Sequence, residues 1–153
     1  MESYEGIPLD DTVELPIKPG IPQSVIVRVM EICGVEYKLK DTNMLDNKYP
    51  VLYGSRENIE NAKKYLKLFT ESKLVLRDIA RLARRFNTVA KIYTEDDDLK
   101  YIMEIVSQNV TNRDKLKILE KVPESNEDCE TLDLCGKKIY VYVWYFLIIF
   151  NFI

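Results

Sequence analysis

The sequence predicts an α+β protein in which a small sheet, with helices on one face, is followed by a helical extension. Apolar runs suited to strands alternate with runs of helical periodicity over roughly the first 70 residues. Residues 73–93 then repeat apolar side chains at spacings of four and three, which is typical of a helix. With 153 residues, 46% apolar and 31% charged, the chain can form one domain with a buried core or two very small units.

The expected first unit covers residues 12–69 and follows a flexible arm, residues 1–11. Residues 12–19 suit a short edge strand, because their two prolines restrict strand pairing. After the turn "GIPQ", residues 24–33 are predicted to form a helix. Ser24 is its expected N-cap, and the glycine that follows the helix is its expected stop.

Two strands and a second helix complete this unit. Residues 35–40, "VEYKLK", alternate apolar and charged side chains, which indicates a half-buried strand with its valine, tyrosine and leucine facing one way. Residues 49–54 are predicted to form the next strand, which ends in a glycine. The helix over residues 56–69 then begins from Ser55, its expected N-cap.

The expected helical extension covers residues 70–122. Its longest helix, residues 73–93, carries an apolar seam of six side chains. The seam consists of Val75, Ile79, Leu82, Phe86, Val89 and Tyr93. Two further helices are predicted over residues 99–108 and 111–122, and residues 123–136 are predicted to form a disordered acidic linker.

Composition excludes several kinds of chemistry. The chain contains no histidine, which rules out a Ser-His-Asp triad, a Cys-His dyad and a histidine-ligated metal site. Its three cysteines fit neither a zinc framework nor a disulfide scaffold. The acidic run Asp96–Asp98 lacks calcium-loop spacing and is interpreted as the N-terminal turn of a helix. We therefore expect a non-enzymatic protein with no catalytic residue, no metal site and no cofactor.

Charge is segregated along the chain, although the formal net charge is only −3. Residues 56–93 contain 10 basic and 4 acidic side chains, whereas residues 94–136 contain 5 basic and 12 acidic ones. A polyanion responds to the local field rather than to the overall charge, so its contacts are expected within residues 56–93.

Seven basic side chains in this region are the candidate site for a nucleic-acid backbone. They are Lys63, Lys64, Lys67, Arg77, Arg81, Arg84 and Arg85. Arg77, Arg81 and Arg84 follow i, i+4, i+7 spacing, which places them on one face of a helix, and such phosphate contacts give affinity without sequence specificity. The alternative is a solvated face opposite the apolar seam, paired with carboxylates from the acidic segment.

Two motifs in residues 12–69 resemble the KH domain. "SVIVRVMEICGVEYKLK" resembles its second helix and second strand, and "YPVLYGSRENIENAKKYL" resembles its last strand and last helix. The resemblance implies a KH-like fold and binding of single-stranded RNA, which KH domains grip with a GXXG loop. Residues 20–23 read Gly-Ile-Pro-Gln at that place, so the second glycine is missing. The departure points to a scaffold, a protein-binding role or RNA contact through another face.

A second resemblance is to the N-terminal domain of glutathione transferases. "PGIPQSVIVRVMEICGVEYKLKD" resembles its first helix and second strand, and "YPVL" would supply its cis-proline, with Ser24 near the thiol site. The spacing argues against this resemblance. Pro50 follows Lys40 by only ten positions, which leaves little room for the helix that this fold requires there.

Residues 137–153 form an apolar tail after two lysines. Its last 15 residues are shorter than the roughly 20 that a membrane-spanning helix needs. Three interpretations stay open: a buried element, a membrane anchor, or intron read-through that produces a truncated isoform. The third rests on A/T-rich codon usage and on a splice-donor-like sequence that can encode residues 136–138.

The function expected from these observations is that of an RNA-associated or scaffolding protein that uses the basic helix face. The alternatives are a protein-interaction module that docks a partner through the helical seam, and a glutathione-transferase-like fragment. The expected partner is single-stranded RNA or another protein, with membrane contact through the tail not favoured. Because the sequence has no signal-peptide pattern and few cysteines, we expect a cytoplasmic or nuclear location.

Overall fold

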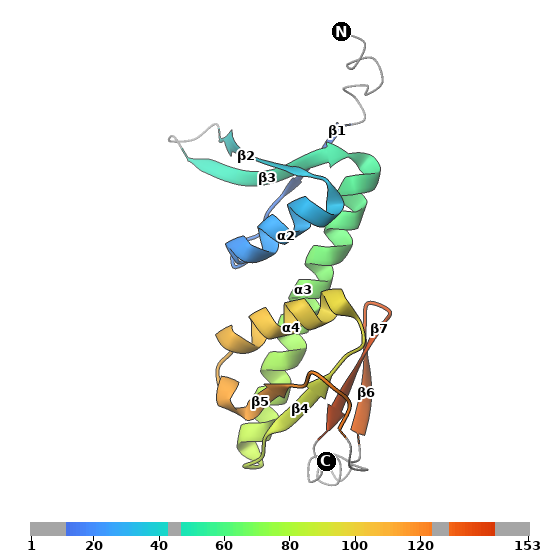
Figure 1. The fold of residues 1–153 in the computed structure, drawn as a ribbon. Helices are drawn as coiled ribbons and strands as arrows, with labels where there is room; N and C mark the ends of the chain where they lie inside the picture. Colours follow the sequence, from blue (N-terminus) through green and yellow to red (C-terminus); the bar gives the residue numbers. More distant parts are fainter. Residues whose placement is uncertain (1–11, 43–46, 124–128, 143–153) are drawn as a thin grey trace. The chain divides into compact units, whose positions relative to one another are not determined.

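The computed structural model describes residues 12–42, 47–123 and 129–142. These residues form helices and two separate sheets, which confirms the predicted α+β class (Figure 1). The chain divides into two compact units between Leu66 and Lys67. This boundary falls within the long helix α3 (Arg56–Arg85), so α3 contributes its first turns to one unit and its remaining turns to the other.

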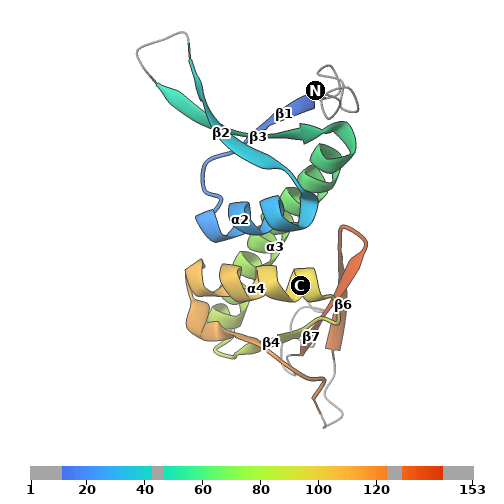
Figure 2. The same cartoon turned by 45° about the horizontal axis from the view of Figure 1, so that its top comes forward.

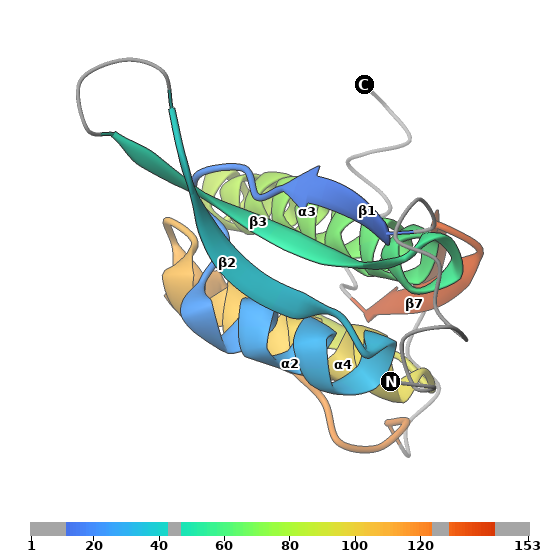
Figure 3. The same ribbon diagram turned by 90° about the horizontal axis from the view of Figure 1, so that it is seen from above.

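The first unit is built on an antiparallel sheet with the strand order β1-β3-β2. Its strands are β1 (Thr12–Pro16), β2 (Glu36–Asp41) and β3 (Lys48–Ser55). Helix α2 (Gln23–Cys33) connects β1 to β2, and α3 follows β3 directly. Figures 1 and 3 show α2 and the first turns of α3 on the same face of this sheet, as the sequence predicts.

The inner face of this sheet is centred on β3. The register places Leu15 and Tyr37 opposite Leu52 from its two sides, and Leu52 is fully buried. Val35 is also buried, in agreement with the predicted strand pattern. Tyr37 and Leu39 share the alternating face but are exposed, because β2 is an edge strand of the sheet.

Two predicted helix ends are confirmed in this unit. Gly34 stops α2 in the left-handed conformation with φ +68°, and a Cβ atom there would lie 3.3 Å from the amide nitrogen of Asn58. Ser55 caps α3, since its hydroxyl oxygen accepts a hydrogen bond from the backbone N–H of Asn58 at 3.2 Å.

The predicted N-cap of α2 is wrong. The helix begins at Gln23, and Pro22 occupies the capping position without a side-chain hydrogen bond. The carbonyl oxygen of Pro22 instead accepts the first backbone hydrogen bonds of the helix. Because proline already fixes φ near the value seen here, −64°, the chain enters the helix before Ser24, which lies exposed in the first turn.

The second unit combines the later turns of α3 with a four-stranded sheet in the order β5-β4-β7-β6. Its elements are β4 (Ala90–Tyr93), α4 (Asp97–Asn109), the 3-10 turn η2 (Arg113–Lys115), β5 (Leu116–Ile118), β6 (Cys129–Leu134) and β7 (Lys137–Tyr142). Strands β4 and β5 are parallel and connected through α4, while the other pairings are antiparallel. Figure 2 shows α4 together with β4, β6 and β7.

Helix α4 agrees with the predicted helix over residues 99–108. Its N-cap is Asp96, whose side-chain oxygen accepts a hydrogen bond from the backbone N–H of Leu99 at 2.9 Å. Asp97 and Asp98 lie in its first turn, where the helix dipole favours negative charge. The interpretation of this acidic run as a helix N-terminal turn is therefore confirmed.

The prediction of a separate helix over residues 73–93 is wrong at both ends. Residues 56–85 form one continuous helix, and Asn87, with φ +53°, reverses the backbone after it. Residues 90–93 form strand β4, in which Ala90 and Ile92 are buried and alternate with half-buried side chains. The predicted seam extends too far because its last members, Val89 and Tyr93, are four residues apart. Residues with this spacing share a face in a helix and also in a strand.

The buried stripe of α3 in this unit is also displaced from the predicted seam. Its fully or nearly fully buried members are Leu68, Phe69, Ser72, Leu76, Ile79, Ala80 and Ala83. Of the predicted seam, Ile79 is buried, whereas Val89 is 42% exposed. Two of the buried positions of α3 are therefore alanines, Ala80 and Ala83, where the prediction expected larger apolar side chains.

Two further predictions in the extension are wrong. The helix expected over residues 111–122 is a 3-10 turn followed by β5, because Asn112 has φ +66° and breaks the helical path. The acidic segment, residues 123–136, is not a linker throughout: residues 129–134 form β6, which pairs with β7. Residues 124–128 lie outside the described part of the chain.

The predicted apolar tail begins within the fold. Residues 137–142 form β7, in which Ile139 and Val141 are buried between more polar positions. Residues 143–153, on which the membrane-anchor hypothesis depends, lie outside the described residues. Among the residues that the structure describes, no helix is long and apolar enough to cross a membrane.

Candidate functional site

The seven basic residues predicted as a binding site all lie on α3 and are all exposed. Lys63 and Lys64 belong to the part of α3 in the first unit, and the other five belong to the second unit. Within the second unit, Arg77, Arg81, Arg84 and Arg85 fall within an arc of about 100° around the helix axis. We call these four residues the arginine face.

The arginine face is compact and lies opposite the buried stripe of α3. It extends over roughly 12 Å along the helix, at 1.5 Å per residue. Its four guanidinium groups therefore belong to one short stretch of a single helix face. Arg84 and Arg85 occupy the last turn of α3, where positive charge also interacts favourably with the helix dipole.

Local carboxylates neutralise the arginine face only in part. The carboxylate of Asp78 lies 3.4 Å from an Arg81 guanidinium nitrogen and 4.0 Å from Nε of Arg77. All three side chains are more than half exposed, and ion pairs of this kind contribute about 0–1 kcal/mol. The Arg85 guanidinium lies 5.7 Å from the centre of the Phe86 ring, an arrangement that leaves its outer N–H groups available.

The acidic segment that follows β4 has partners of its own. Asp96 pairs with Lys137 at 2.5 Å, and Glu120 pairs with Lys100. Among the residues that the structure describes, no ion pair joins this segment to the arginine face. The pairing that would make the arginines part of an internal charge network is therefore not seen in this part of the chain.

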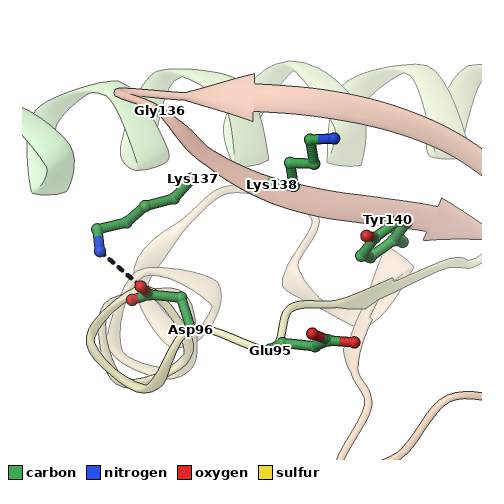
Figure 4. Close-up of a pocket in the computed structure, with 6 residues that line it drawn as sticks. All are labelled: Glu95, Asp96, Gly136, Lys137, Lys138 and Tyr140. Atoms are coloured by element: carbon green, nitrogen blue, oxygen red, sulfur yellow. Dashed lines mark hydrogen bonds and ion pairs between the residues drawn. The ribbon is translucent and has the colours of Figure 1, made fainter.

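A second polar feature lies in the second unit, where the end of β4 meets the start of β7. A hollow of about 430 Å³ opens there (Figure 4). It is lined by Glu95, Asp96, Gly136, Lys137, Lys138 and Tyr140. We call it the Tyr140 hollow; the sequence did not predict it.

One side of the Tyr140 hollow is held in place by hydrogen bonds. The buried hydroxyl of Thr94 donates to the carbonyl oxygen of Lys138 at 2.9 Å and accepts from the backbone N–H of Asp96 at 3.2 Å. Partial burial opposes ionisation of Asp96, but the ammonium group of Lys137 and the Leu99 N–H keep the pKa of this carboxyl below its usual value. Asp96 and Lys137 therefore form a charge-compensated pair.

The other side of the hollow belongs to the outer face of the sheet. Tyr93 and Tyr140 are opposite each other on β4 and β7, and their ring centres are 6.3 Å apart with a 32° tilt. Lys138 lies two residues before Tyr140 and therefore points to the same face, while Ile139 between them is buried. Figure 4 shows the Tyr140 ring and the Glu95 carboxylate beside the same hollow.

A signal for this face was present in the sequence. Residues 137–142 read Lys-Lys-Ile-Tyr-Val-Tyr, so polar or aromatic side chains alternate with apolar ones at positions 138–142. This period of two indicates a half-buried strand. It was missed because the segment continues into a long apolar run and was interpreted as part of a tail.

The loop that corresponds to the KH clamp connects β1 to α2. Gly20 has φ +91°, a conformation that suits glycine, but Pro22 stands where a backbone N–H would be needed to contact a phosphate. Lys18 is exposed near the start of this loop. The peptide bond before Pro50 is trans, so the cis-proline implied by the glutathione-transferase resemblance is not present.

Taken together, these features define a two-unit α+β protein with an arginine face on α3 and a tyrosine-lined hollow on its second sheet. The family model described as "Uncharacterized protein MJ0093 family" matches residues 12–141, and the chain belongs to this family. Uncharacterized protein MJ0093 from Methanocaldococcus jannaschii is 51% identical over 131 residues, which cover 86% of this chain and 91% of that protein. No solved structure matches the chain.

The matched region includes both candidate surfaces. The arginine face and the residues of the Tyr140 hollow all fall within residues 12–141. The match also continues past residues 136–138, where the read-through hypothesis places its junction.

Proposed function

We propose that the protein associates with single-stranded RNA through the arginine face of α3. The observation that carries this proposal is the arrangement of four exposed guanidinium groups within one arc of a helix, where Asp78 is the only carboxylate of the described residues that pairs with them. Guanidinium groups bind phosphate through paired N–H donors and are always charged at physiological pH. The face can therefore bind a backbone without reading its sequence.

The first unit supports the same proposal through its KH-like arrangement. Helix α2 runs through Gly34 into β2, and β3 carries Gly54 near its end before α3 begins. This is the order of elements on which the resemblance depends. Because the GXXG clamp is incomplete, we assign the RNA contact to α3 rather than to the loop at residues 20–23. A scaffolding role for the first unit is part of this proposal.

We further propose that the protein works in the cytoplasm or the nucleus. Its three cysteines are free thiols in the structure, which fits a reducing compartment. The partner-docking alternative has less support, because the predicted seam is not one continuous helix face: Ile79 is buried in the fold, and Tyr93 belongs to strand β4.

The test is salt-dependent binding of a fluorescent single-stranded RNA to the full chain and to the double variant Arg81→Ala plus Arg84→Ala. Loss of two phosphate contacts should weaken binding on the order of tenfold and reduce the slope of log K against log salt by about 1.4. The matched control is Lys18→Ala plus Lys48→Ala, which removes two exposed positive charges elsewhere. Equal losses in both variants, or no RNA binding at low salt, would contradict the proposal.

A further inference from the structure

The Tyr140 hollow combines three groups that together suit one nucleotide of a single strand. It offers an aromatic ring, an ammonium group and a carboxylate, contributed by Tyr140, Lys138 and Glu95. All three belong to the outer face of the second sheet or to the segment that leaves it. Its volume, about 430 Å³, is within the range of small-ligand sites.

The Tyr140 ring is supported in its position. Its strand is central in the sheet, with β4 on one side and β6 on the other, and its neighbours Ile139 and Val141 are buried. Tyr93 lies beside it on β4. A ring held in this way loses little freedom when a base stacks on it, and stacking accepts any base because each has a π-face.

Four charged side chains line the hollow: Asp96 and Lys137 form an ion pair, and Lys138 and Glu95 are the other two. Asp96 is held by Lys137 at 2.5 Å, so this pair contributes little net field. Lys138 and Glu95 are exposed and make no ion pair among the described residues. An ammonium group attracts a phosphate, and a carboxylate accepts hydrogen bonds from the exocyclic amino group of a base.

We propose that the Tyr140 hollow binds one base of a single-stranded RNA, stacked on Tyr140, with Lys138 at the adjoining phosphate and Glu95 accepting from the base amino group. This inference rests on the proposed function for its ligand class, but it uses a different surface from the arginine face. The arginine face supplies sequence-independent attraction. The hollow supplies a preference for a base that carries an amino group, so oligo(C) binds more tightly than oligo(U).

The experiment compares fluorescence anisotropy of ten-nucleotide oligo(C) and oligo(U) with the full chain and its variants at fixed salt. Tyr140→Ala should weaken oligo(C) binding roughly tenfold, whereas Tyr140→Phe should retain it because the ring is retained. Tyr140→Leu preserves apolar packing without a ring and should behave like alanine, which separates stacking from folding. The matched control is Tyr49→Ala, a half-buried tyrosine of the first unit.

Two further variants assign the polar roles. Lys138→Ala should weaken both oligonucleotides several-fold and lower the salt slope by about 0.7. Glu95→Gln should reduce the preference for oligo(C) over oligo(U) with little change in the salt slope. Cytidine monophosphate is tested in parallel. If this free nucleotide binds as tightly as the oligonucleotide, the ligand of the hollow is a free nucleotide and the proposal of an RNA strand is overturned.

The outcomes separate this inference from the proposed function. RNA binding that depends on Arg81 and Arg84 but is unchanged in Tyr140→Ala and Tyr140→Leu would overturn the hollow and retain the arginine face. Binding that is lost in the tyrosine variants but unchanged in the arginine variant would retain the hollow alone. Equal binding of oligo(C) and oligo(U) in the unmodified chain would overturn the assigned role of Glu95.

Discussion

The two sheets of this protein carry similar side chains on their outer faces but arrange the charges differently. On the first sheet, both Lys38 and Lys40 contact Glu14, at 2.7 and 2.5 Å, and Lys38 also lies 4.8 Å from the centre of the Tyr53 ring. On the second sheet, Lys138 lies near Tyr140 without an ion pair among the described residues.

The difference between these faces comes from the position of one carboxylate. Glu14 lies on β1, so it faces β3 and reaches across it to the two lysines of β2. Hydrogen bonds from Lys38 and then from Lys40 lower the pKa of Glu14, so it stays ionised and holds both ammonium groups. On the second sheet the corresponding acid, Asp96, pairs with Lys137 and leaves Lys138 available. Among the described residues, similar side chains therefore produce a self-compensated face in one unit and a face with an unpaired lysine in the other.

Both outer faces can be compared only while the inner face of each sheet stays packed. A substitution that disrupts this packing should therefore have the largest effect on stability. Leu52 is fully buried at the centre of β3, so Leu52→Ala should lower the free energy of unfolding by about 2–5 kcal/mol. The measurement is urea unfolding followed by circular dichroism. Leu39→Ala is the control on the same sheet, because its side chain is 54% exposed and should cost no more than about 0.5 kcal/mol. Equal costs would mean that the inner face of the first sheet is not organised around β3.

The compensated pair at the Tyr140 hollow gives a smaller, pH-dependent effect. Asp96→Asn keeps a capping acceptor but removes the pair with Lys137, so it should cost about 0.5–1 kcal/mol at neutral pH. Because the folded pKa of Asp96 is lowered, its contribution is complete above the unfolded value near 3.9 and is lost as the pH falls through the folded value. The difference between the two proteins should therefore shrink below about pH 4, as measured by urea unfolding at several pH values. A difference that stays constant down to pH 2 would show that charge is not its source.

The first unit was more predictable than the second because its signals are local. Gly34 and Ser55 mark helix ends through their own backbone and hydroxyl groups, and residues 35–40 alternate within a single strand. Strand β4 has only four residues, and the spacing of its apolar residues resembles that of the helix before it. Its strand conformation depends on pairing with β5 and β7. Such distant pairing is not encoded in any short window of sequence.

The two candidate surfaces divide in the same way. The arginine face was predictable because helical spacing alone places its members together. The Tyr140 hollow requires the register of Tyr93 with Tyr140 and the position of Glu95 after β4, which depend on strands separated by more than 40 residues. The sequence shows the alternation in residues 137–142, but it does not show that Tyr93 and Glu95 lie beside this strand.

The smallest expected effect is also the most direct test of the comparison between the two sheets. It comes from a substitution that makes the outer face of the first sheet resemble that of the second. Glu14→Gln removes the carboxylate that holds Lys38 and Lys40, and should leave stability almost unchanged because these side chains are substantially exposed. One of the two released ammonium groups, that of Lys38, lies beside Tyr53, so the first face then carries an unpaired lysine next to an aromatic ring. Binding of oligo(C) should strengthen a few-fold, and the salt slope should steepen by about 1.4.

Glu36→Gln is the matched control for this gain. Glu36 is opposite Tyr53, is exposed and makes no ion pair among the described residues, so its removal changes net charge by the same amount without releasing a lysine. If both variants strengthen RNA binding equally, net charge alone accounts for the gain and the position of the carboxylate is irrelevant. If only Glu14→Gln strengthens it, the availability of lysine beside an aromatic ring is what separates the two faces, and the same property at Lys138 and Tyr140 explains why the second sheet is the one proposed to bind.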